Sequence, residues 1–324
     1  MDIRQLRYFV AIAEQGSLSA AAQALGIAQP SLSQHVIKLE RQLGLSLLVR
    51  SSRGVTPTDD GRLLLDHARL ILAAVERCTA ELNEAGGRVR GPVAFGMPPS
   101  ISMALSVPLA ETVRLELPGV RLQAVEAMSG YIRSWLEEGR VDLAFLFDLD
   151  RVRGYEVTHL LDEDLFFLSA PDAWPAGLPR GGEVPLAMLA GLELVLPTPT
   201  HGLRRLIEAQ ARACGISLNV VVEMDAMTQI KELVARGSGY TILAPAAARD
   251  FVARGDLLRA RIVEPVVSRR VYLLRNPARA PSRAARAVEA VCREVVRDLI
   301  ARGIWEGRAV AAASAPAPAD PLPR

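Results

Sequence analysis

The chain has 324 residues, of which 50% are hydrophobic and 23% are charged, with a formal net charge of +2. This length allows two or three domains with cores of their own, and the composition is ordinary for a globular protein. No apolar run approaches a membrane span or a signal-peptide core, and the cysteines (Cys78, Cys214 and Cys292) lack the spacing of a metal or redox motif. We therefore expect neither an exported nor a membrane-spanning protein, and we predict a cytoplasmic protein without a metal site or cofactor.

Positive charge gathers at the N-terminus. Residues 1–58 contain six Lys or Arg and three Asp or Glu, whereas the remainder contains 32 and 33. A modest positive bias over one small domain fits contact with phosphates, and a dimer would double it.

The first predicted helix spans residues 3–15, with Asp2 as its N-terminal cap and Gly16 as its stop. Its apolar side chains recur at helical spacing, so they predict a buried face. These side chains are Leu6, Phe9, Val10 and Ala13.

A helix-turn-helix is predicted next. Ser17 or Ser19 can cap a short helix that Gly26 ends, and Pro30 is tolerated in the first turn of the following helix. That second helix has an apolar stripe of Leu32, Val36, Leu39 and Leu43, and a polar side of Ser31, Gln34, Lys38 and Arg41. Two short helices joined by a glycine-containing turn are typical of a DNA-binding unit.

A wing and a long helix are predicted to follow. Two short strands, within residues 45–49 and near Val55, flank a basic turn, for which a solvated surface loop is the alternative. Thr56-Pro57-Thr58-Asp59 predicts a helix start, with a Thr cap, Pro at the first position and an acid at the third. We therefore expect a DNA-binding domain over residues 1–58 and a linker helix over residues 59–87.

The linker helix carries an unbroken heptad seam, which predicts pairing with a second helix and hence a dimer. The alternative is an amphipathic helix that packs on its own domain. The seam residues are Leu64, Ala68, Ile71, Val75, Cys78 and Leu82. Pairing would place two recognition helices about one helical turn apart on DNA.

Residues 88–92 contain Gly and Pro and predict a hinge. Beyond it, strands alternate with helices, which predicts two α/β lobes with a parallel sheet and helices on its faces. We place this regulatory domain at residues 93–303, with one lobe at about 93–161 and 266–303 and the other at about 162–265. Residues 304–324 are Ala/Pro-rich without periodicity and predict a disordered tail.

The N-terminal motifs carry a family resemblance. Through Gly16-Ser17-Leu18-Ser19-Ala20-Ala21-Ala22, Gln29-Pro30-Ser31-Leu32-Ser33, Leu43-Gly44 and Leu47-Leu48-Val49-Arg50, the chain resembles the LysR-type transcriptional regulators. A weaker resemblance, over roughly the first 250 residues, is to the branch of the nitrogen assimilation control regulator. The chain departs from many members at Leu48-Val49, at Gln34 in place of Arg and at Asp60 in place of Ala, so the base preference cannot be carried over.

The resemblance implies a winged helix-turn-helix, a type 2 periplasmic-binding-protein fold for the lobes, promoter DNA as ligand of a homodimer or homotetramer, and contact with RNA polymerase. Gln29, Ser33 and Gln34 would face base edges, since Gln pairs with adenine in bidentate fashion. Ser31, Lys38 and Arg50 would hold phosphates, Pro30 would open the recognition helix, and Arg53 would enter the minor groove.

A small-molecule effector, with an anion as one option, is implied between the lobes. Predicted helix N-termini there offer unpaired N–H groups and partial positive charge. In the family, the stretches that match Ser100, Ser102, Ser129, Thr198, Thr200, His201 and Thr228 line the effector cleft. For each residue alone, a helix cap is the alternative. His201 is the titratable member: it could sense ligand charge or pH near neutrality, and the alternative is an exposed histidine without such a role.

Other functions remain as alternatives. One is a ligand-independent regulator of the nitrogen-assimilation type, another is a thiol-based redox sensor that uses Cys214 and Cys292, and a third is a solute-binding protein, which would need export. We do not expect an enzyme, because the sequence has no nucleophile elbow, phosphate-binding loop or paired histidine ligands.

Overall fold

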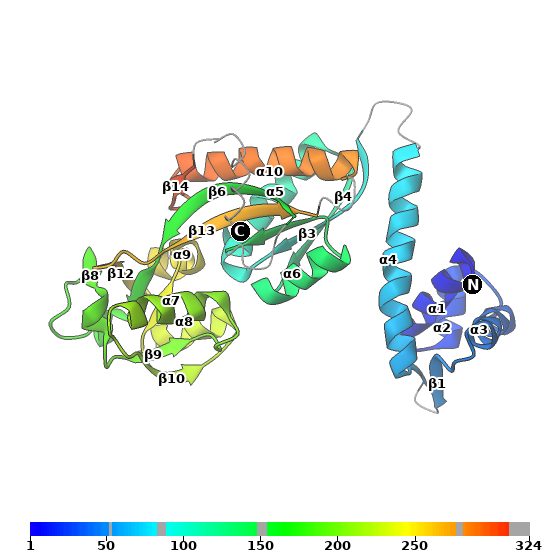
Figure 1. The fold of residues 1–324 in the computed structure, drawn as a ribbon, viewed down its shortest axis with the longest axis horizontal. Helices are drawn as coiled ribbons and strands as arrows, with labels where there is room; N and C mark the ends of the chain where they lie inside the picture. Colours follow the sequence, from blue (N-terminus) through cyan, green and yellow to red (C-terminus); the bar gives the residue numbers. More distant parts are fainter. Residues whose placement is uncertain (52–53, 83–88, 148–153, 277–280, 311–324) are drawn as a thin grey trace, which may run out of the picture. The chain divides into compact units, whose positions relative to one another are not determined.

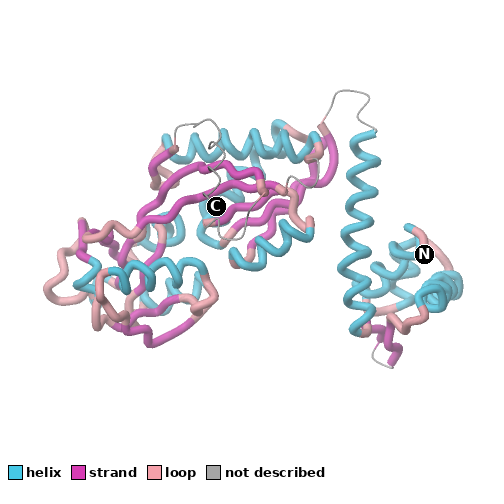
Figure 2. The backbone as a smooth tube through the Cα atoms, viewed as in Figure 1, coloured by secondary structure: helices cyan, strands magenta, loops and turns pink. Residues whose placement is uncertain are grey.

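The computed structural model describes residues 1–51, 54–82, 89–147, 154–276 and 281–310, the side chains of residues 77 and 80–82 excepted. The chain divides into two compact units, Met1–Gly91 and Pro92–Arg324. Their helices and strands are shown in Figure 1, and Figure 2 colours the same backbone by secondary structure. None of the helices in the described part of the chain combines the length and the hydropathy of a membrane span.

The first unit is helical with a two-stranded wing. Asp2 and Gln5 form a capping box at the start of the first helix, and Gly16 ends it with a φ of 62°, as predicted. Ser17 caps the second helix. The elements are α1 (Ile3–Gln15), α2 (Leu18–Leu25), α3 (Gln29–Leu43), β1 (Leu48–Ser51), β2 (Gly54–Pro57) and α4 (Asp59–Leu82).

The core of this unit joins α1, α2, α3 and the wing. Its buried members include Phe9, Ile12, Ala21, Leu32, Val36, Leu39, Leu47 and Val55. Leu43 was predicted to continue the stripe, but it lies in the last turn of α3 and is 37% exposed. The buried stripe therefore ends one turn earlier than predicted.

The wing is attached to α3 and α4 by polar contacts. Glu40 Oε1 accepts hydrogen bonds from the backbone N–H groups of Leu47 and Leu48. Thr58 caps α4 by accepting from the N–H of Gly61 at 2.9 Å. The prediction that Thr56 caps this helix is wrong, because Thr56 is paired in β2 and the helix begins at Asp59.

The second unit contains two lobes. The first lobe is built on a six-stranded sheet in the order β14-β6-β13-β5-β3-β4. In Figure 1, α10 and α6 cover opposite faces of this sheet, and α10 packs against α5. The elements are β3 (Arg90–Met97), α5 (Pro99–Glu116), β4 (Gly119–Glu126), α6 (Ser129–Glu138), β5 (Leu143–Leu146), β6 (Glu156–Asp164), β13 (Ser268–Arg275), α10 (Arg283–Ala301) and β14 (Arg308–Ala309).

The second lobe has a four-stranded sheet in the order β11-β7-β12-β8 and a parallel pair of β9 and β10. One apolar cluster joins these strands to α7, α8 and α9. The elements are β7 (Phe166–Ser169), η1 (Pro171–Ala173), β8 (Glu183–Pro185), η2 (Leu186–Leu189), β9 (Glu193–Leu196), α7 (Gly202–Ala213), β10 (Asn219–Glu223), α8 (Met227–Ala235), β11 (Thr241–Leu243), α9 (Pro245–Arg254) and β12 (Leu258–Val263).

Two expectations for this unit are corrected. The first-lobe sheet is mixed instead of parallel: β3 and β5 are parallel, but β13 re-enters from the second lobe and runs antiparallel to both β5 and β6. The prediction of a disordered tail is wrong for residues 305–309, because Trp305 is fully buried and β14 pairs with β6. Residues 311–324 lie outside the described chain.

Candidate functional site

The first turns of α3 present polar side chains at the surface. Gln29, Pro30, Ser31, Gln34 and Lys38 are exposed, and Ser33 is half-buried. Leu32, Val36 and Leu39, on the opposite side of the helix, are buried in the core, so packing holds the polar face outward. Arg50 is exposed on β1, whereas Arg53 lies outside the described residues.

Gln29 is oriented by a contact that the sequence analysis missed. Ser19 Oγ on α2 donates to Gln29 Oε1 at 2.9 Å. The bond uses the amide oxygen and leaves the amide NH₂ group as a donor. In the sequence, the signal for this contact was the short separation of ten residues between Ser19 and Gln29, which lie on either side of the turn.

The predicted seam of α4 divides into two parts. Ala68 is fully buried against Leu6 and Val10 of α1, and Leu64 packs against the same cluster. These two residues therefore belong to the core of their own unit. Further along the helix, Ile71 is 37% exposed. Val75 is half-buried and Cys78 is exposed, while the side chain of Leu82 lies outside the described residues.

Two cavities lie between the lobes of the second unit. The smaller one has a volume of about 560 Å³ and contains Ser129 of α6, the first turn of α7 and part of β13. Among the described residues that line it there are four arginines and no acidic residue, which favours an anion. The lining residues are Ser129, Phe147, Gly202, Leu203, Arg205, Leu206, Ala209, Arg212, Ser268, Arg269, Arg270 and Tyr272.

Ser129, which lines this smaller cavity, has a buried hydroxyl. Its Oγ has no hydrogen-bond partner within the described chain, although the residue is only 9% exposed. Ser129 was predicted to cap its helix, but it is the first helical residue and Met128 occupies the cap position without a side-chain bond. A buried hydroxyl without a partner is costly unless a ligand or water satisfies it.

Ser100 and Arg269 form a buried network beside the same cavity. Arg269 Nη2 donates to Ser100 Oγ at 2.8 Å. Arg269 Nε donates to Glu163 Oε1 at 2.6 Å, and the guanidinium lies 3.7 Å from the centre of the Phe147 ring. The side chains of Arg269 and Glu163 are 4% and 1% exposed, so the charges are paired and shielded from water. Neither residue was among the sequence candidates, because the partners are far apart in the chain.

His201 is buried and acts as a helix cap. Its Nδ1 accepts a hydrogen bond from the N–H of Leu203 at 3.1 Å. Burial, together with the positive charge of Arg269, lowers the pKa of His201 to about 4. The imidazole is therefore neutral at pH 7, and the expectation that it senses pH near neutrality is not met.

The other predicted effector residues lie elsewhere. Thr198 Oγ1 contacts Asp225 Oδ1 at 3.0 Å and Thr200 Oγ1 at 2.9 Å, so these hydroxyls are already paired. Ser102 is half-buried on α5 and is not part of either cavity lining. Thr228 lines the larger cavity and is thus separated from the cavity of Ser129.

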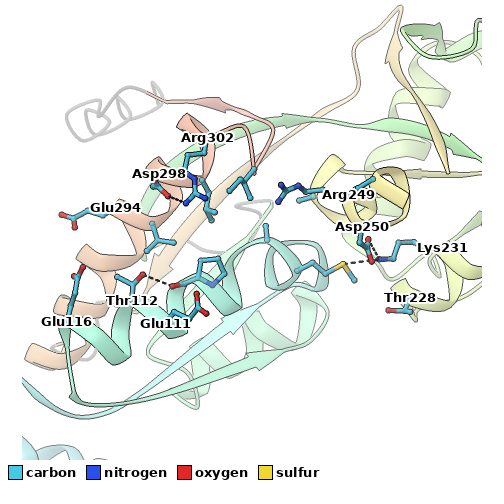
Figure 3. Close-up of a pocket in the computed structure, with 18 residues that line it drawn as sticks. Glu111, Thr112, Glu116, Thr228, Lys231, Arg249, Asp250, Glu294, Asp298 and Arg302 are labelled. Atoms are coloured by element: carbon cyan, nitrogen blue, oxygen red, sulfur yellow. Dashed lines mark hydrogen bonds and ion pairs between the residues drawn. The ribbon is translucent and has the colours of Figure 1, made fainter. Parts of the chain in front are cut away.

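The larger cavity, of about 1010 Å³, is shown in Figure 3. Helices α5 and α10 of the first lobe face α8 and α9 of the second. Lys231 Nζ pairs with Asp250 at 3.1 Å, and Arg302 pairs with Asp298 at 3.0 Å. Arg249 points into the cavity from α9. Five acidic residues and three basic residues line this space, so it does not favour an anion.

The chain matches two family models and a curated relative. Residues 3–62 match the bacterial regulatory helix-turn-helix protein of the lysR family, and residues 86–297 match the LysR substrate binding domain. The nitrogen assimilation regulatory protein nac of Klebsiella aerogenes is 34% identical over 309 residues, which are 95% of this chain and 98% of that protein. The chain belongs to the LysR family.

Solved LysR-family structures agree with this fold. A full-length OxyR variant from Pseudomonas aeruginosa is 25% identical, with a TM-score of 0.67 over 92% of this chain and 95% of that one. CbnR complexed with its target DNA is 24% identical, with a TM-score of 0.71 over 92% of this chain and 99% of that one. The predicted N-terminal helix-turn-helix and two-lobed α/β effector domain are therefore confirmed.

The cysteines give the thiol-based alternative no geometric support. Cys292 is fully buried on α10, and burial raises the pKa of its thiol, which keeps it in the unreactive protonated form. Cys214 is exposed at the end of α7 in the other lobe. All three cysteines are free thiols.

Proposed function

We propose that this LysR-family regulator reads promoter DNA with α3. Gln29 and Gln34 are exposed on the helix face that the core leaves free, and Ser33 lies between them. These residues would contact base edges, with Pro30 opening the helix beside them. Ser31, Lys38 and Arg50 would bind phosphates, and Arg53, outside the described residues, is assigned to the minor groove from the family pattern alone.

A paired α4 would bring two such helices to one DNA site. The exposed positions Ile71 and Cys78, with Val75 between them, continue the heptad pattern beyond the part of α4 that α1 covers. Apolar side chains at this spacing favour a second copy of the same helix. Homodimers or homotetramers would then place recognition helices in successive major grooves.

The effector that we propose is a small carboxylate-bearing anion in the smaller inter-lobe cavity. Two observations carry this assignment: the buried Oγ of Ser129 has no partner among the described residues, and four arginines line the same cavity as Ser129. Planar guanidinium groups match carboxylates in bidentate geometry. Binding would change the relation of the lobes, and hence subunit spacing, DNA bending and contact with RNA polymerase.

One observation favours the ligand-independent alternative. The hydroxyl of Ser100 already accepts a hydrogen bond from Arg269, so this predicted effector residue has a partner within the chain itself. The similarity to the nitrogen assimilation regulatory protein nac fits either mechanism. The two mechanisms differ in whether an anion changes DNA binding.

The test combines mapping with titration. Genome-wide mapping of bound DNA identifies the operator, and the purified full-length chain is then titrated with citrate, a small polycarboxylate, while operator affinity is measured. We expect citrate to bind and to change operator affinity in the wild type, with binding weakened at least tenfold in Ser129→Ala. A wild-type chain that binds its operator but no carboxylate would favour the ligand-independent mechanism, and a chain without sequence-selective DNA binding would contradict the whole proposal.

A further inference from the structure

A short C-terminal segment contacts both lobes where the chain passes between them. We call residues 305–310 the C-terminal strap. Its strand β14 pairs with β6 of the first lobe, and Glu306 forms an ion pair with Arg259 of β12 at 2.8 Å. A Cβ at Gly307 would overlap Cδ1 of Leu161 and would lie 3.0 Å from the carbonyl oxygen of Asp162, so a larger residue here would require the Leu161 side chain to shift. The strap begins beyond residue 297, where the match to the LysR substrate binding domain ends.

The strap is linked to the smaller cavity through buried side chains. Trp305 Nε1 donates to Glu163 Oε2 at 3.0 Å, while Glu163 Oε1 accepts from Arg269. Arg269 in turn donates to Ser100 at the start of α5 and lines the smaller cavity. Trp305 and Glu163 are 0% and 1% exposed, so this series of contacts is closed to solvent at its strap end.

The neighbouring carboxylate fastens the strap on the other side of β6. Arg308 donates to both oxygens of Asp164 at 2.9 Å, and Arg261 of β12 donates to Asp164 Oδ2 at the same distance. Burial raises the pKa of Asp164, but the bonds from Arg308 and Arg261 outweigh it and hold the pKa below its usual value. Because alternate residues of a strand point to opposite faces, Glu163 and Asp164 bind the strap from two sides.

We propose that Trp305 is a positioning residue for the effector site: its indole N–H holds Glu163, which sets the guanidinium of Arg269 between Ser100 and the smaller cavity. This inference rests on the proposed anion site, since Arg269 lines that cavity. The ligand class is the same small carboxylate, and the strap determines how the arginine meets it.

Removal of the indole N–H tests the link. Without this donor, Glu163 Oε2 is a buried carboxylate oxygen that lacks the bond from Trp305. The carboxylate then turns toward other donors and draws Arg269 away from Ser100. Trp305→Phe keeps an aromatic ring against Phe145, so most of the packing survives while the hydrogen bond is lost.

The matched control is Trp174→Phe in the second lobe. Trp174 is also buried, at 8% exposure, and its Nε1 donates to the carbonyl oxygen of Leu178 at 3.1 Å. Both variants lose one buried indole hydrogen bond, but only Trp305 contacts Glu163. Circular dichroism establishes that each full-length variant is folded.

Two readouts are measured on the wild type and both variants: hydrogen–deuterium exchange at residues 99–103 and 268–270, and the Kd for citrate. We expect Trp305→Phe to speed exchange at both segments about tenfold and to weaken citrate binding about tenfold, while Trp174→Phe changes neither. Arg269→Lys keeps the charge but not the planar fork of the guanidinium, and we expect it to speed exchange at residues 99–103 alone. This variant is the substitute measurement if Trp305→Phe does not fold.

Unchanged exchange in Trp305→Phe, or equal effects in both tryptophan variants, overturns the positioning role. If Trp305→Phe does not fold, normal exchange at residues 99–103 in Arg269→Lys overturns it. A wild type that ignores citrate contradicts the anion site alone, because the exchange measurements need no ligand and still decide the role of the strap.

Discussion

The two units of this chain use polar side chains in opposite ways. On α3, Gln34 and Lys38 are exposed, and the contacts proposed for them would be made with DNA. In the second unit, Arg269 and Glu163 are almost fully buried and complete each other across 106 positions of sequence. An exposed side chain of the first kind is replaceable without harm to folding, whereas a buried charge of the second kind is not.

The comparison predicts which property each substitution changes. In the first unit, exposed positions should alter DNA binding and leave unfolding unaffected. In the second unit, buried polar positions should alter unfolding first.

The largest effect is expected from Ile71→Glu. A carboxylate at this exposed seam position should separate the paired helices, and loss of bivalent binding should weaken operator affinity about 10²–10⁴-fold. Sedimentation equilibrium and operator titration measure both quantities. Ala73→Glu, about 200° around the helix from Ile71, is the control. A dimer with native affinity in Ile71→Glu would move the seam elsewhere.

Arg269→Met should destabilise the second unit by about 3–5 kcal/mol, because it leaves Glu163 buried without its charged partner. Urea unfolding of the full chain measures this loss. The neighbouring Arg270 is exposed on the same strand, and Arg270→Met should change the free energy of unfolding by about 0.5 kcal/mol or less. Equal losses in the two variants would refute the contrast between buried and exposed arginines.

His201 should make stability depend on pH. Its pKa of about 4 in the folded chain lies below the ordinary value of 6.5, so the unfolded chain binds the proton first as the pH falls. Stability from this group is full above pH 6.5 and is lost toward pH 4, by about 3 kcal/mol. His201→Asn keeps a cap acceptor without titration, so the wild-type minus variant difference in urea unfolding should shrink over this range. A constant difference contradicts the assignment.

Gln34→Ala should cost about 1–3 kcal/mol on the cognate operator and flatten base preference at one position, with unfolding unchanged. Binding-site selection from random DNA gives the preference profile. Gln23→Ala, at an exposed position of α2, is the control. If Gln34→Ala left the base-preference profile unchanged, Gln34 would not be a base-contacting residue.

Lys38→Ala should have the smallest effect. Loss of one phosphate contact should lower the slope of log affinity against log salt by about 0.9 and weaken all sequences alike. Arg114→Ala, exposed on α5 in the other unit, should leave the slope as it is. An effect confined to one DNA sequence would mean that Lys38 contacts a base.

Local signals in the sequence predicted the first unit well. The bounds of α1 follow from Asp2 and Gly16, since caps act within a few residues. Pro30 likewise marks the start of α3, because its ring suits the first turn. The sequence could not predict which part of the α4 seam is buried in its own unit. The same heptad pattern fits both Ala68, which packs against α1, and Ile71, which is exposed.

The cleft was only partly predictable. Helix N-termini pointed to Ser100, Ser129 and His201, which do lie at or beside the smaller cavity, but also to Thr228, which does not. Arg269 was missed because its partner Glu163 is 106 positions away, and no periodicity encodes such a pairing. The strap was missed because Trp305 is a single apolar residue at the edge of an Ala/Pro-rich stretch, and a single residue forms no periodic pattern.

The burial of Ala68 between Leu6 and Val10 has a mechanical consequence. It fuses the base of α4 to α1, and Arg69 adds a clamp to Glu14 at 2.8 Å. Apolar packing and an ion pair therefore both hold the first half of α4 against α1. We expect a rotation imposed on the far end of α4 to be transmitted to α1 and, through the shared core, to α3.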